Sequence, residues 1–225
     1  REEAFEIDYL DLPESETIQY VEDLLVNNSC FYRKYEIGED TPENRALATL
    51  ISKAIEQPFY TEMRTNQQLG YIVWSYPRSY DEVYYFNLVI QSGVYPADEL
   101  DKRVDAFISG SVDIINNLDD ETFQQLIDSA IEQLERQPMS ISERATKYKN
   151  LIFEHGGDFD RDKKTIESLR VIKKERVAEH LKTMVSKDSR KMVNILGFAD
   201  NHENSTGMKS SFSNLEEWKS TRVYK

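Results

Sequence analysis

The sequence has few of the residues that most often carry metal or thiol chemistry. Its 225 residues include one cysteine and three histidines. The single Cys30 excludes an internal disulfide and any metal site built from several thiolates. We interpret Cys30 as a small residue within a strand. Its isolation fits a reducing compartment, and together with the composition it favours a soluble, cytoplasmic protein.

Long apolar runs and an excess of positive charge are also missing. No hydrophobic stretch approaches the roughly 20 residues that a membrane span needs. Lys and Arg number 28 against 41 Asp and Glu, and the formal charge of −13 repels a phosphate backbone. We therefore expect neither a membrane nor a nucleic acid as partner. The start, Arg1-Glu2-Glu3-Ala4, matches neither a signal peptide nor an initiator methionine, so we expect a fragment of a longer chain.

Bulky apolar residues are plentiful. The hydrophobic class makes up 39% of the chain and includes 13 Tyr and 10 Phe, which is enough for a substantial core. We expect residues 1–225 to form a single domain. Within it, the polar residues 201–225 should form a loop and a C-terminal extension packed on the rest.

The clearest helix signal begins at Thr41, a hydroxyl cap that is followed by Pro42 at the first helical position and an acid in the first turn. Apolar residues then recur every three or four positions: Leu47, Leu50, Ile51, Ala54, Ile55 and Phe59. We expect Pro58 to kink or locally unwind this helix without ending it. Gly70 is the expected break.

The other elements follow from periodicity and turn signals. Strand patterns cover residues 30–37, 71–76, 83–92 and 191–198, and the entry segment suggests an edge strand at 5–10. Helical patterns cover most of residues 97–184, including a helix after a capping box at 140–143 with Ala145, Tyr148 and Ile152 facing inward. The sequence therefore predicts an α+β fold, in which helices cover one side of a mixed, largely antiparallel sheet.

The histidines do not complete a zinc motif. His155 and His180 each follow a glutamate, as at the end of the inverted motif H-x-x-E-H. The first histidine of that motif would stand at positions 151 or 176, which hold Leu151 and Arg176. His202 also lacks the second histidine of H-E-x-x-H. We interpret all three as solvent-facing or capping side chains and expect no metal ligands in this segment.

Arg64 and Tyr71 remain as candidates for chemistry. They stand on either side of Gly70, where the helix pattern gives way to a strand pattern. A guanidinium and a phenol hydroxyl are donors suited to a carbonyl oxygen or to the oxyanion that it becomes. The alternative is that Arg64 pairs with nearby acids and that Tyr71 is an ordinary strand aromatic. These residue types alone leave both readings open.

The segment from Arg64 to Tyr71, R-x-x-x-Q-L-G-Y, resembles the C-terminal region of the insulin-degrading enzyme and pitrilysin family of zinc metallopeptidases. Ile90-Gln91-Ser92 and Phe159-Asp160-Arg161-Asp162 add to the resemblance. Such enzymes consist of homologous α/β domains in two halves that enclose a chamber, with H-x-x-E-H in the first domain. The resemblance implies that this chain is the last domain, in the half without zinc.

The resemblance also implies roles and partners. Arg64 and Tyr71 become auxiliary catalytic residues that contact the substrate carbonyl near the scissile bond. Zinc is bound by another domain of the parent enzyme and by no residue of this segment, which should be inactive alone. The implied partners are peptide substrates and the N-terminal, zinc-bearing half of the same enzyme. Two alternatives remain: a non-catalytic scaffold or binding subunit of the same family, and a protein-interaction module outside it.

Overall fold

The computed structural model describes residues 12, 15–80 and 82–224, and its centre is a mixed five-stranded sheet. The strands are β1 (Glu16–Asp23), β2 (Ser29–Glu39), β3 (Ile72–Tyr80), β4 (Val83–Ser92) and β5 (Lys191–Phe198). Their order is β1-β5-β2-β4-β3. Only the β1–β5 pair is parallel, and the other three pairs are antiparallel. The predicted mixed, largely antiparallel sheet is confirmed.

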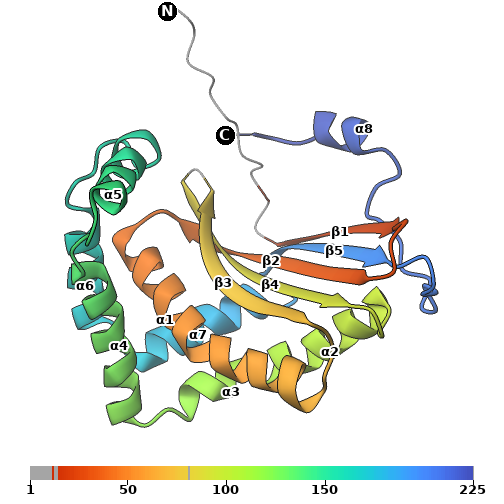
Figure 1. The fold of residues 1–225 in the computed structure, drawn as a ribbon, viewed down its shortest axis with the longest axis horizontal. Helices are drawn as coiled ribbons and strands as arrows, with labels where there is room; N and C mark the ends of the chain where they lie inside the picture. The colour runs from red at the N-terminus through yellow and green to blue at the C-terminus, as the bar shows by residue number, and fades with distance from the viewer. Residues whose placement is uncertain (1–11, 13–14, 81, 225) are drawn as a thin grey trace, which may run out of the picture.

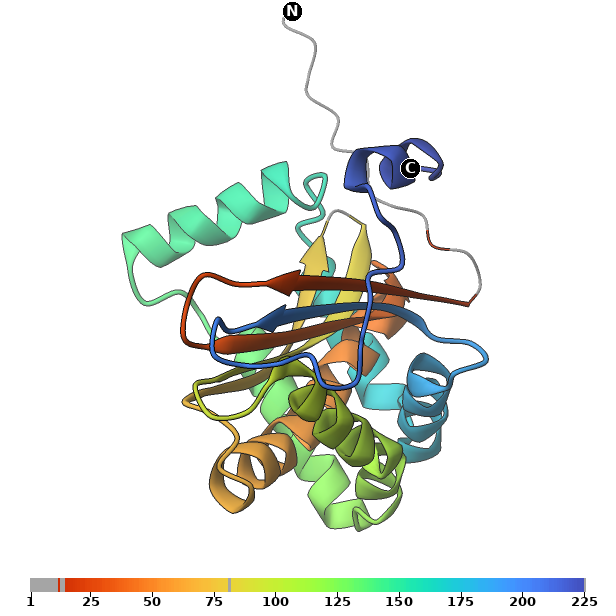
Figure 2. The ribbon, with the colours of Figure 1, turned by 90° about the vertical axis from the view of Figure 1, so that its right-hand side faces the viewer.

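Helices account for most of the remaining described chain. They are α1 (Pro42–Tyr60), η1 (Thr61–Asn66), α2 (Ala97–Ser109), α3 (Ser111–Asn116), α4 (Asp120–Glu135), α5 (Ile141–Phe153), α6 (Arg161–Val171), α7 (Lys174–Val185) and α8 (Leu215–Ser220). The helices α1, α2 and α7 lie beneath one face of the sheet, whereas α8 rises beyond the opposite face (Figures 1 and 2). None of the described helices is long and apolar enough to cross a membrane.

The core lies between the sheet and the helices beneath it. Thr41 caps α1 by accepting a hydrogen bond from the Asn44 N–H at 3.1 Å, as the sequence predicts. The apolar face of α1 is buried against inward residues of β2 and β4: Leu47, Leu50, Ile51, Ile55, Phe59, Phe31, Tyr35, Phe86, Leu88 and Ile90. Each such side chain stabilises the fold by about 1.5–3 kcal/mol. This burial fixes α1, and with it the start of β3, relative to the sheet.

One strand was not predicted. The sequence suggested an edge strand at residues 5–10, which lie outside the described residues, whereas β1 spans Glu16–Asp23. Within β1 only Ile18 is fully buried, so the alternation of buried and exposed positions is weak. Its stability comes from parallel pairing with β5 near the other end of the chain, which no local pattern reveals.

The helix α5 corrects a second expectation. Its cap is as predicted, because Ser140 Oγ accepts a hydrogen bond from the Glu143 N–H at 3.0 Å. The predicted inward face is wrong, since Ala145 is exposed and Tyr148 and Ile152 are each half exposed. Leu151 is the buried residue of this helix. Figure 1 shows the reason: α5 stands at the periphery of the molecule, away from the sheet.

The segment after β5 runs along the outer side of β1. Ser211 N–H donates to Gln19 O at 2.7 Å, and the Gln19 N–H donates to Ser211 Oγ at 2.8 Å. The Val21 N–H donates to Ser210 Oγ at 2.8 Å. Further along, the rings of Tyr20, Phe212 and Trp218 stack in series with centroids 5.9 and 4.9 Å apart. The described part of residues 201–225 therefore closes one edge of the sheet.

Candidate functional site

The site is built on the corner between α1 and β3. Pro58 lies inside α1 without ending it, as predicted, and the chain continues as the π-helix η1 up to Asn66. The wide turn is closed by a hydrogen bond from Gln67 N–H to Glu62 O at 2.9 Å. Short π segments of this kind often mark functional positions. The expected break at Gly70 is wrong, because the helix ends earlier and Gln68, with φ of 52°, makes the turn.

Gly70 has a different role at this corner. A Cβ atom on Gly70 would lie 1.9 Å from the carbonyl oxygen of Gln91 and 3.4 Å from Ser92 Cα. Both are backbone atoms of β4, which cannot swing aside as a side chain does. Only glycine allows the chain to cross this close before β3 begins. Next to it, Leu69 is fully buried and anchors the crossing in the core.

Arg64 and Tyr71 meet at the exposed side of the corner. The Arg64 Cζ atom lies 5.7 Å from the centroid of the Tyr71 ring, within range for a cation–π contact. The Tyr71 side chain is 87% exposed. Neither side chain forms a hydrogen bond or an ion pair with another residue that the structure describes. The alternative in which Arg64 pairs with nearby acids therefore finds no support among the described residues. Tyr71 is exposed at this corner and Arg64 is partly exposed.

A polar network holds the chain between these two residues. Asn66 Nδ2 and Gln67 Nε2 donate to the two Glu62 carboxylate oxygens at 2.8 and 2.7 Å. These hydrogen bonds, from Asn66 first and then Gln67, lower the pKa of Glu62. Arg103 on α2 donates to Gln67 Oε1 at 3.3 Å and is itself held by Glu99 at 2.8 Å. Local sequence patterns do not reveal Arg103, because its hydrogen bond to Gln67 joins positions 36 apart.

The histidines serve the fold. His180 Nε2 lies 3.1 Å from the carbonyl oxygen of Ile37, and His202 Nδ1 lies 2.8 Å from Ser29 Oγ. Burial lowers the pKa of His155 and of His180. Both side chains are partly buried. Among the described residues, no three His, Cys, Asp or Glu side chains are grouped so that they could hold a metal ion.

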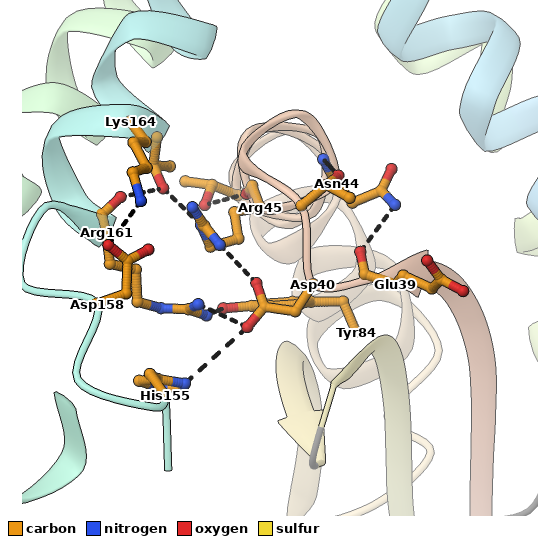
Figure 3. Close-up of polar contacts among 12 residues, drawn as sticks. Glu39, Asp40, Asn44, Arg45, Tyr84, His155, Asp158, Arg161 and Lys164 are labelled. Atoms are coloured by element: carbon orange, nitrogen blue, oxygen red, sulfur yellow. Dashed lines mark hydrogen bonds and ion pairs between the residues drawn. The ribbon is translucent and has the colours of Figure 1, made fainter. Parts of the chain in front are cut away.

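The Phe159-Asp160-Arg161-Asp162 motif supplies a structural ion pair. Arg161 at the start of α6 lies 2.6 Å from the Asp40 carboxylate and donates to the Tyr84 hydroxyl at 2.9 Å (Figure 3). Arg45 on α1 holds the same Asp40 at 2.7 Å, and His155 Nδ1 lies 3.9 Å away. These side chains are largely buried, so breaking one pair leaves an uncompensated charge. The motif fastens α6 to α1 and lies apart from Arg64 and Tyr71.

Comparisons with known proteins show which sequences this chain is similar to. Residues 50–149 match the family model described as PQQ synthase PqqF-like, C-terminal lobe domain 4. Human insulin-degrading enzyme is 32% identical over 181 residues, which cover 79% of this chain and 18% of that enzyme. The nardilysin-like protein of Arabidopsis thaliana is 31% identical over 73% of this chain and 16% of its own length. The chain thus spans less than a fifth of these relatives.

The fold points to the same group. A crystal structure of pitrilysin superposes with a TM-score of 0.82 at 18% identity, covering 97% of this chain and 24% of pitrilysin. Motif, sequence relatives and fold agree, and the matched model describes a C-terminal domain. The chain therefore belongs to the insulin-degrading enzyme and pitrilysin family of peptidases.

Proposed function

We propose that the chain is the C-terminal, substrate-binding and transition-state-assisting domain of a zinc-dependent metalloendopeptidase that cleaves peptides in an enclosed chamber. One observation carries the proposal: Arg64 and Tyr71 lie side by side at a braced corner, with no competing partner among the described residues. The peptidase names of the relatives support the reaction class. Peptide substrates and the N-terminal half of the same enzyme are the proposed partners.

In this proposal the two donors act on one carbonyl oxygen. The Tyr71 hydroxyl donates a hydrogen bond to the peptide carbonyl, and this bond strengthens as the oxygen gains negative charge during attack. The Arg64 guanidinium, with its planar set of N–H donors, orients the same peptide group. Zinc would supply Lewis acidity from another domain of the parent enzyme. In this proposal the chain contributes the two donors, and the other domain would contribute the metal.

The test is Tyr71→Phe in the full-length enzyme. Loss of one oxyanion donor should lower kcat by roughly ten- to a thousandfold, with a smaller change in KM. Tyr80→Phe is the matched control, because Tyr80 is a partly exposed tyrosine at the far end of the same strand. It should leave kcat within about twofold of the wild type. Unchanged turnover of peptides by Tyr71→Phe would remove this residue from the mechanism.

A second candidate is a subunit of the same family that binds peptides without hydrolysing them. It is favoured by a related structure titled peptidase M16 inactive domain from Pseudomonas fluorescens, which superposes with a TM-score of 0.63 at 14% identity over 88% of this chain and 47% of that one. Assaying the full-length protein against a mixed peptide library separates the two. Hydrolysis that is abolished by a chelator supports the enzyme, and binding without hydrolysis supports the scaffold.

A further inference from the structure

The two edges of the sheet differ in how their backbone groups are satisfied. The β1 edge is occupied by Ser210 and Ser211, which pair with the backbone of Gln19 and Val21. The β3 edge has no such cover. Among the residues that the structure describes, β3 pairs with β4 alone, and no other segment forms a backbone hydrogen bond with it. A row of unpaired N–H and C=O groups therefore begins next to Tyr71.

The side chains of this edge alternate between two surroundings. Val73 and Ser75 are buried toward the helices. Ile72, Trp74 and Tyr76 point to the opposite, open face, and the Trp74 side chain is 58% exposed. The side chains of Ile72, Trp74 and Tyr76, which are at least partly exposed, thus lie beside the unpaired backbone. Cross-strand neighbours on one face of a sheet stabilise pairing when they are aromatic or β-branched.

Natural edge strands usually carry devices that prevent pairing, and β3 carries one in its far half only. Pro77 has no N–H group, so no ladder hydrogen bond can be donated from that position. Arg78, just beyond it, is exposed and lies over the Tyr80 ring at 4.8 Å. Residues 72–76, between Tyr71 and Pro77, contain no proline and no charged residue. The half of the strand next to the candidate site is the half that remains open to pairing.

We propose that residues 72–76 bind an extended peptide as an additional strand of the sheet. This rests on the proposed function, since the bound segment would be the peptide whose carbonyl meets Tyr71 and Arg64. The unpaired N–H and C=O groups of β3 alternate along the strand. The main chain of another extended segment can form hydrogen bonds with them at the same spacing. The main chain would supply most of the affinity, because it forms the repeated hydrogen bonds. Sequence preference would be confined to apolar side chains at alternate positions, above Trp74.

The geometry makes strand addition and donor action complementary. A peptide held along β3 would enter or leave the sheet next to the exposed Tyr71, whose ring lies beside Arg64. Pairing restricts the rotation of the bound main chain, so the carbonyl next to the last paired residue has few orientations left. Tyr71 would then act on a peptide group that is already oriented.

Amide hydrogen exchange, followed by NMR on the whole chain, tests this directly. The probe is an N-acetylated, C-amidated octapeptide of alternating threonine and valine with two lysines for solubility. At a peptide concentration about ten times Kd, the β3 amides that face away from β4 should exchange about tenfold more slowly. These amides alternate along residues 72–76. The Gln19 and Val21 amides, already bonded to serine hydroxyls, are the internal control and should not change.

A second arm uses the peptide backbone. Each peptide residue is N-methylated in turn, which removes one donor without altering the protein. Strand addition predicts a period of two, in which every second methyl group lowers affinity by tenfold or more and the intervening ones have little effect. Uniform sensitivity, or protection that is absent from β3, would overturn the proposal. If Tyr71→Phe still impairs turnover in that case, the proposed function stands without strand addition.

Discussion

The two edge strands of the sheet, β1 and β3, differ in whether other segments form hydrogen bonds with their outward-facing backbone groups. Along β1, Ser210 and Ser211 form hydrogen bonds with main-chain groups of Gln19 and Val21, and the rings of Tyr20, Phe212 and Trp218 stack nearby. Along β3, no described segment covers the edge, and Pro77 and the exposed Arg78 limit pairing in its far half. An unpaired edge favours association with other extended chains, so proteins usually cover it.

The difference is instructive because of what lies next to each edge. The covered edge adjoins no candidate donor, whereas the uncovered edge begins at Tyr71, beside Arg64. Glycine and a polar network hold that corner in place, so its exposure does not come from disorder. An edge that is rigid, uncovered and next to two free donors has the properties expected of a binding surface.

The largest expected effect is a loss of stability when a side chain is introduced at Gly70. Gly70→Ala places a methyl group 1.9 Å from the Gln91 carbonyl oxygen, and the backbone of β4 must move. We expect a loss of about 3 kcal/mol in the free energy of unfolding, at the upper end of the range for overpacking. Urea denaturation measures it.

The matched control for that change is Gly110→Ala. A Cβ atom at Gly110 would meet nothing closer than the Phe107 carbonyl oxygen at 3.7 Å, and its φ of −96° suits any residue. This variant should be neutral or more stable by up to about 1 kcal/mol, because alanine lowers the entropy of the unfolded chain. Equal stability of the two variants would show that Gly70 does not fix the β3 edge.

A smaller effect is expected from uncovering β1. Ser210→Ala removes the acceptor of the Val21 N–H, and Ser211→Ala removes that of the Gln19 N–H. Each loss should cost about 1 kcal/mol, so the amide concerned should exchange about fivefold faster. Ser213→Ala is the control, because Ser213 forms no side-chain hydrogen bond with a described residue. Unchanged exchange in the first two variants would mean that β1 is no better covered than β3.

The smallest expected effect is a pH dependence of stability and of NMR signals at the corner that precedes β3, around Glu62. The pKa of Glu62 is lowered in the folded chain, so its carboxylate adds stability above the ordinary value of 4.5. That contribution disappears as the pH falls through the lower, folded-state pKa. The Asn66 and Gln67 side-chain amide signals should then shift in an NMR titration below pH 4.5. Glu62→Gln should abolish this shift, and persistence in that variant would assign it to another group.

Sequence patterns located the elements whose signals are local. Thr41 and Pro42 predicted the start of α1, and the apolar period placed its buried face correctly. The strand β1 was missed because its pairing with β5 is a contact between distant parts of the chain. Helix α5 has an apolar period but buries only Leu151 among the described residues, so the pattern overstated its burial.

For the candidate site, the sequence indicated Arg64 and Tyr71 but not the neighbouring residues that hold this corner in place. The motif singled out Arg64 and Tyr71, and the structure brings their side chains together. Their catalytic role stays a prediction. The hydrogen bond from Arg103 depends on tertiary packing, so no local sequence pattern predicts it. The turn at Gln68 has a positive φ, which glutamine rarely adopts, so the sequence does not predict it either.

Pro77 has one further consequence, for peptide length. The pairing stretch between Tyr71 and Pro77 contains five residues, which in an extended strand span about 17 Å. In the proposed binding mode, a peptide of about five residues would already make the main-chain contacts available between Tyr71 and Pro77. Longer peptides would gain little further affinity from β3. Pro77 would thus limit the length of the peptide segment that pairs with the strand, measured from Tyr71.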